Sequence, residues 1–104
     1  MDVAMTISLL LKNEFDSGVR SRGAEYFRAR LVRILQGTPT EVTATVRGSS
    51  TYEVALMLEG NELNMSCSCP YFQDSGACKH LWATILAAEQ RGDLGELADR
   101  KSVV

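Results

Sequence analysis

Residues 41–69, EVTATVRGSSTYEVALMLEGNELNMSCSC, contain three stretches in which apolar and polar residues alternate. Alternation places every second side chain on the same face of an extended strand. Gly-Ser-Ser at 48–50 and Glu-Gly-Asn-Glu at 59–62 separate the stretches and predict short turns. Short turns between strands favour an antiparallel meander. The residues expected to share one face of each strand are Val42, Ala44 and Val46, then Tyr52, Val54, Leu56 and Leu58, then Leu63, Met65, Cys67 and Cys69.

On either side of this segment the spacing of apolar residues predicts helices. From Lys79 onward, apolar residues recur at helical spacing until Gly92 ends the run. Before the meander, residues 5–15 and 21–29 predict two helices, with Ser21 as N-cap of the second and with Tyr26 and Phe27 facing inward. Residues 31–35 predict a further strand. The expected fold class is α+β: N-terminal helices, an antiparallel meander of three to four strands, and a C-terminal helix.

Length and composition are those of one small globular domain spanning residues 1–104. The chain has 104 residues, of which 45% are hydrophobic, so intrinsic disorder is not expected. We divide it into a lead-in of helix and meander (15–62), a finger (63–91) and a polar tail (92–104). No apolar run approaches the roughly 20 residues of a membrane span, and no signal peptide is recognised, so the expected location is the cytoplasm.

The cysteines and the histidine are clustered. All three cysteines and the only histidine lie within 67–80, as Cys67, Cys69, Cys78 and His80. In a reducing compartment, clustered cysteines more often indicate a metal than disulfides. Cys₃His is a standard ligand set for structural zinc, and four protein ligands leave no open position for catalysis. We therefore predict a Zn²⁺ site and a binding module that is not an enzyme and takes no small-molecule substrate.

Three alternative interpretations compete with the zinc site. The cysteines could be small apolar core residues beside a hydrogen-bonded histidine. Cys-x-Cys could be a thiol–disulfide redox pair, which would leave Cys78 and His80 unexplained. A Cys–His nucleophile pair is also conceivable, but the sequence shows no oxyanion-hole glycine motif or orienting partner.

The sequences Cys-Ser-Cys-Pro-Tyr-Phe at 67–72 and Cys-Lys-His-Leu-Trp-Ala at 78–83 resemble the SWIM zinc finger, whose pattern is CxC, a variable gap and CxH. Upstream, Arg-Gly-Ala-Glu-Tyr at 22–26, Val-Arg-Gly-Ser at 46–49 and Tyr-Glu-Val at 52–54 resemble the lead-in to this finger in bacterial Swi/Snf-type helicase-like ATPases. The resemblance covers roughly residues 15–90. It implies a zinc-bound ββα finger that binds DNA or another protein, often beside an ATPase domain. This chain has no P-loop, so an ATPase would lie elsewhere. The alternative function is a scaffold that positions a neighbouring catalytic domain.

A basic segment precedes the meander in a chain whose net charge is −2. Residues 19–33 hold five arginines against one acid, Glu25. Arginines interleaved with aromatic residues can meet nucleic-acid phosphates, although a solvated helix face is the more ordinary explanation. The candidate nucleic-acid contacts are Arg20, Arg22, Arg28, Arg30 and, beside the predicted zinc, Lys79.

Overall fold

The computed structural model describes residues 6–97. It has a four-stranded antiparallel sheet with strand order β1-β2-β3-β4, in which each strand pairs with its neighbour in the sequence. The strands are β1 (Val32–Gly37), β2 (Glu41–Arg47), β3 (Thr51–Glu59) and β4 (Glu62–Cys67). The predicted meander and the α+β fold class are confirmed.

The strands form where the alternation predicted them, because one face of the sheet is buried. Val42, Val46 and Leu56 are completely buried on this face. β2 and β3 pair without irregularity from Glu41↔Met57 to Arg47↔Thr51. β1 is less regular: its register with β2 shifts between Ile34 and Gln36, and Leu35 is 59% exposed. The sequence placed this strand at 31–35, whereas it runs from Val32 to Gly37.

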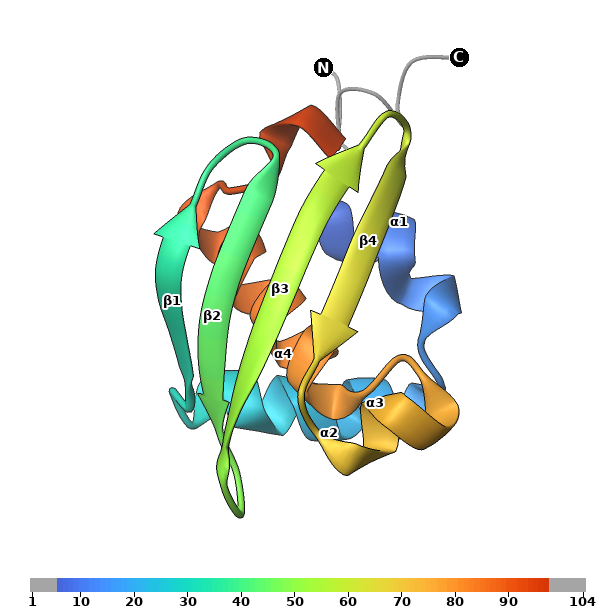
Figure 1. Ribbon diagram of the computed structural model, residues 1–104, viewed down its shortest axis with the longest axis vertical. Helices are drawn as coiled ribbons and strands as arrows, with labels where there is room; N and C mark the ends of the chain where they lie inside the picture. The colour runs from blue at the N-terminus through green and yellow to red at the C-terminus, as the bar shows by residue number, and fades with distance from the viewer. Residues whose placement is uncertain (1–5, 98–104) are drawn as a thin grey trace.

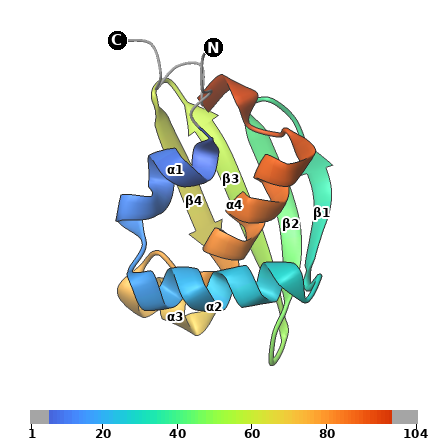
Figure 2. The ribbon, with the colours of Figure 1, turned by 180° about the vertical axis from the view of Figure 1, so that it is seen from behind.

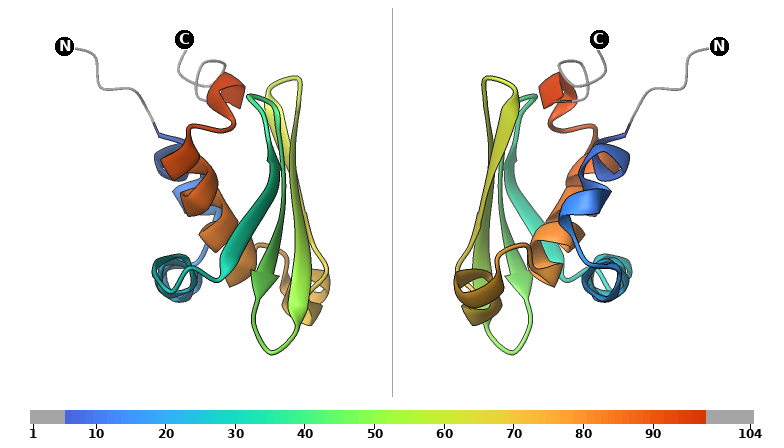
Figure 3. Two further views of the ribbon diagram at one scale, coloured as in Figure 1. Left: turned by 90° about the vertical axis from the view of Figure 1, so that its left-hand side faces the viewer. Right: turned by 90° about the vertical axis from the view of Figure 1, so that its right-hand side faces the viewer.

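Helices cover the inner face of the sheet, as Figures 2 and 3 show. The helices on this side are α1 (Ile7–Leu11), α2 (Ser17–Arg28) and α4 (Lys79–Arg91), and a short 3₁₀ turn, η1 (Lys12–Glu14), follows α1. α4 lies along the sheet and supplies the centre of the core, where Leu81 and Ile85 are completely buried. Gly92 ends α4 in the left-handed conformation at φ 83°, as predicted.

The first turn of α2 differs from the prediction. The sequence predicts Ser21 as the N-cap, but the helix begins at Ser17, and the side chain of Asp16 caps it by accepting a hydrogen bond from the N–H of Gly18 at 3.0 Å. Ser21 is an exposed residue inside the helix. The prediction was wrong here because the first turn, Ser-Gly-Val-Arg, contains only one apolar residue, so periodicity gave little signal. Tyr26 and Phe27 are half-buried.

The remaining labelled helix, α3 (Pro70–Ser75), lies beyond the end of β4, at the lower end of the sheet in Figure 1. The sequence predicted no helix in this stretch. After α4 the structure describes only part of the predicted polar tail, and there Leu94 and Leu97 are completely buried. No helix among residues 6–97 is long and apolar enough to cross a membrane.

Candidate metal centre

The first pair of cysteines lies where β4 passes into α3. Cys67 is the last residue of β4, in register with Val54 of β3. Cys69 lies two residues further, beyond the strand, and caps α3: its Sγ accepts a hydrogen bond from the N–H of Phe72 at 3.3 Å. The predicted strand through Cys69 therefore ends two residues earlier than expected. Both thiols are nevertheless buried, at 6% and 1% exposure.

α3 and a glycine bring the chain back to the second pair of candidate ligands. Pro70 stands in the first turn of α3, where its missing N–H costs nothing. Gly76 follows the helix with φ 83°, a backbone conformation that L side chains rarely adopt. Cys78 is then the N-cap of α4, and His80 lies in its first turn. The local sequence thus reverses the chain within the finger and returns it to Cys67.

The four candidate ligand atoms lie within 4.8 Å of one another, and all four residues are buried. His80 approaches through Nδ1, which lies 3.9 Å from Sγ of Cys67. A tetrahedral zinc with Zn–S bonds near 2.3 Å holds its ligand atoms about 3.8 Å apart, so the cluster has the right size for this ion. Three soft thiols and one imidazole are also the donor set that zinc prefers. The residues present therefore fit zinc.

The pKa values of two thiols in the cluster, those of Cys67 and Cys78, are shifted in opposite directions. The hydrogen bond with Cys67 lowers the pKa of Cys78 to about 4, and contacts with His80 and the N–H of Leu81 act in the same direction. The same hydrogen bond to Cys78 raises the pKa of Cys67 above its ordinary value, and burial raises it further. A thiolate is thus favoured at the start of α4, where free N–H groups and the helix dipole favour negative charge. The thiolate is the form of cysteine that binds zinc.

Aromatic side chains hold the imidazole from two sides. The ring of Tyr52 lies 4.6 Å from that of His80, and the ring of Tyr26 meets it edge-on at 5.4 Å. Gly48, at the β2–β3 turn, lies so close that an added Cβ would be 3.5 Å from Nε2 of His80. The meander and α2 therefore fix the orientation of the imidazole. These contacts join residues far apart in the chain, so spacing in the sequence does not predict them.

Comparison with known proteins identifies the same region. The family model of the SWIM zinc finger matches residues 52–89, from β3 through most of α4. No curated protein and no solved structure matches the chain. Residues 52–89 thus carry a SWIM zinc finger with a Cys₃His cluster positioned to bind zinc, and the chain contains a zinc-binding module.

The basic residues predicted to contact nucleic acid lie at different places in the structure. Arg22 and Lys79 line a small cavity of about 90 Å³ that also touches Cys78, His80 and the exposed Tyr71. Arg28 and Arg30 line a different, larger groove at the other end of α2.

The two remaining arginines of the segment stand apart from both cavities. Arg20 is half-buried, and its Nε is buried with no hydrogen-bond partner among residues 6–97. Arg33 is exposed on β1. The basic segment of the sequence is therefore not one surface.

Proposed function

We propose that this protein is a zinc-dependent binding module for DNA or another protein, with Cys67, Cys69, Cys78 and His80 as the zinc ligands. The observation that carries the proposal is the cluster of four buried ligand atoms contributed by β4, the start of α3 and the start of α4. A zinc with four protein ligands has no open position for water or substrate, so its role is to hold these elements together. The thiolates, the imidazole and the ion sum to about −1, which the start of α4 and Lys79 partly offset.

The surface proposed for nucleic acid lies directly beside the zinc ligands. Arg22 and Lys79 come from α2 and α4 and meet at one small cavity, whose rim includes Tyr71, 47% exposed. Nζ of Lys79 lies 5.1 Å from the ring centre of Tyr26, which positions the cation. Two cations and an exposed aromatic ring at the start of a helix suit a phosphate backbone. Bound zinc would fix the position of Lys79 in this surface, because Lys79 lies in the sequence between the proposed ligands Cys78 and His80.

The test is a salt titration of duplex DNA binding by the zinc-loaded protein. If Arg22 and Lys79 each neutralise one phosphate, Arg22→Ala/Lys79→Ala should flatten the log–log salt slope by about two units. The matched control is Arg33→Ala/Arg47→Ala, which removes the same charge at two exposed positions on the sheet. Zinc content is measured for each variant, so that loss of the metal is not mistaken for loss of a contact.

An equal slope for the wild type and the Arg22/Lys79 variant would remove this surface from any DNA interface. DNA binding that survives complete zinc removal would contradict the zinc dependence. The resemblance of the lead-in to helicase-like ATPases supports a further part of the proposal, that the module serves as an accessory domain beside such an ATPase.

A further inference from the structure

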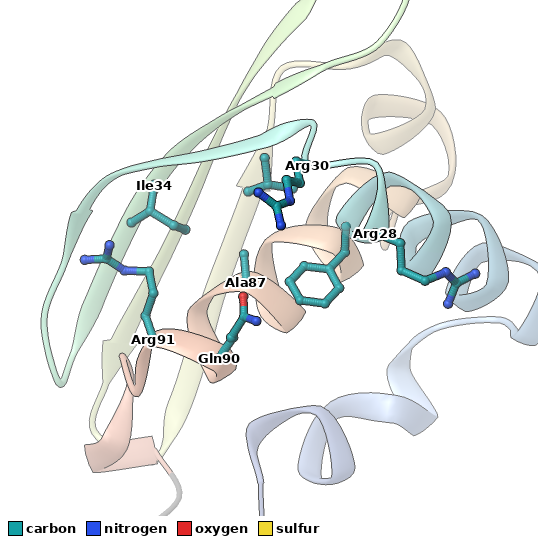
Figure 4. A pocket seen from close by; sticks show the side chains of 8 residues that line it. Arg28, Arg30, Ile34, Ala87, Gln90 and Arg91 are labelled. Carbon is teal, nitrogen blue, oxygen red and sulfur yellow. The ribbon is translucent and has the colours of Figure 1, made fainter.

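A groove lies between the end of α2, the edge strand β1 and the last turns of α4. Its volume is about 480 Å³. Figure 4 shows Arg28 and Arg30 at the α2 end and Arg91 at the α4 end beside Ile34. Along α4, Arg91 lies 11 residues from His80, a distance of about 16 Å at 1.5 Å per residue. None of the four candidate zinc ligands lines this groove, and it shares no lining residue with the cavity beside them.

The chemistry of the groove is divided between a cationic rim and an apolar floor. Its rim has three arginines, and no carboxylate lines it in the described part of the chain. Asp93 nevertheless reaches one of them, since its carboxylate forms an ion pair with Nε of Arg91 at 2.8 Å. Apolar side chains form the floor, namely Phe27, Val32, Ile34 and Ala87. A matching ligand must bring negative charges and apolar groups close together.

One wall of the groove is the edge of the sheet. β1 has β2 on one side and, among the described strands, no strand on the other. The edge of a sheet presents backbone N–H and C=O groups that can pair with an added strand. Side chains of an added strand alternate between two directions, so one set can reach the floor while the carboxylates reach the rim.

We propose that this groove binds an extended, acidic peptide segment of a partner protein, whose carboxylates pair with Arg28, Arg30 and Arg91 and whose apolar side chains cover the floor. The inference deepens the proposed function as a binding module, but it concerns a surface that is not the zinc-side surface of Arg22 and Lys79. Arginine favours carboxylates because its planar guanidinium can make two parallel hydrogen bonds to them.

Nucleic acid fits the groove less well. A duplex presents mainly phosphates and sugars at its surface, which would leave Val32, Ile34 and Ala87 poorly covered. A single strand would need an aromatic platform on which bases can stack, and Phe27, the only aromatic residue lining the groove among the described residues, is half-buried as part of its floor. The observations therefore favour a peptide.

The test is an NMR titration of the zinc-loaded full chain with a capped peptide of six residues, the length of β1, that alternates glutamate with valine. We expect shifts confined to residues 27–34 and 87–91, and slower hydrogen exchange at β1 amides. Arg28→Gln/Arg30→Gln should weaken binding on the order of tenfold. The control Lys12→Gln/Arg47→Gln loses the same charge outside the groove and away from β1, and should bind like the wild type. A peptide with glutamine in place of glutamate should bind more weakly than the acidic one.

Three results would overturn the proposal. The first is no shift at peptide concentrations on the order of 1 mM. The second is equal weakening by the groove variant and its control, which would mean unspecific attraction to charge. The third is tighter binding of oligo-dT than of the acidic peptide in this groove. None of these results affects the salt slope assigned to Arg22 and Lys79, so failure here is distinguishable from failure of the proposed function.

Discussion

Gly23 is the residue that lets α2 approach α4. A Cβ added there would lie 2.8 Å from the carbonyl oxygen of Lys79 and 2.8 Å from Cβ of Trp82. A backbone carbonyl cannot move aside as the end of a side chain can, so the two helices would have to separate. Trp82 is held from the other side by Phe15, with ring centres 5.1 Å apart. Separation would therefore also disturb the start of α4, where Cys78 and His80 lie.

We expect Gly23→Ala to destabilise the zinc-loaded protein by about 1 to 2 kcal/mol, because overpacking outweighs the better helix propensity of alanine. The measurement is urea unfolding followed by circular dichroism. Gly95→Ala is the control: no described residue lies within 4 Å of a Cβ added there, and the stability of the protein should change by less than about 0.5 kcal/mol. A Gly23→Ala protein as stable as the wild type would show that α2 and α4 can adjust freely.

At the scale of single elements, the cap of α2 tests where this helix begins. Asp16→Ala removes the acceptor of the Gly18 N–H and should cost about 1 kcal/mol of unfolding free energy. Ser21→Ala, at the start that the sequence suggested, should be neutral or slightly stabilising because Ser21 is exposed inside the helix. Both variants are compared by urea unfolding. A larger loss for Ser21→Ala than for Asp16→Ala would place the helix start at Ser21 after all.

How well each element could be predicted depended on how much of it is buried. β2 was predicted with its observed bounds, since Val42, Ala44 and Val46 form an unbroken buried face. α3 was missed because none of its six residues is buried, so no apolar periodicity marks it. Pro70 in its first turn is a sequence signal that fits the start of a helix.

The candidate site was predictable in its chemistry but not in its surroundings. Four candidate ligands clustered at 67–80 indicated zinc because their spacing is local in the sequence. Tyr26, Tyr52 and Gly48 could not be placed around His80, since those contacts depend on how α2 and the meander pack against α4. Arg91 was missed for the same reason: it joins Arg28 and Arg30 only in the folded protein.

At the scale of the whole molecule, the core and the finger should respond differently to loss of metal. The wild-type protein should carry one zinc per chain by elemental analysis. After chelation, amide hydrogen exchange should lose protection in α3, which buries no residue of its own, while β2 and β3 keep theirs through Val42, Val46 and Leu56. α4 should stay protected around Ile85, which is completely buried.

Variants separate the effect of the metal from that of the chelator. Cys78→Ser should reproduce the chelated pattern, whereas Ser75→Ala, an exposed serine three residues earlier, should keep both zinc and protection. Unchanged protection of α3 in the metal-free protein would show that the zinc does not hold the finger. Complete unfolding would show that the sheet has no stability without it.

The central position of α4 also determines when this protein can fold during synthesis. The ribosome completes the sheet by Cys67, but the helix that covers its inner face begins only at Lys79. Until α4 emerges from the ribosome, Val42, Val46 and Leu56 of the nascent chain have no helix to pack against. His80, one of the proposed metal ligands, is also not yet synthesised. α2 also cannot reach its final packing before then, because Gly23 contacts a helix that is synthesised more than 50 residues later. Folding and metal uptake therefore come late and together, and the unfinished chain is the form most exposed to aggregation and to chaperones.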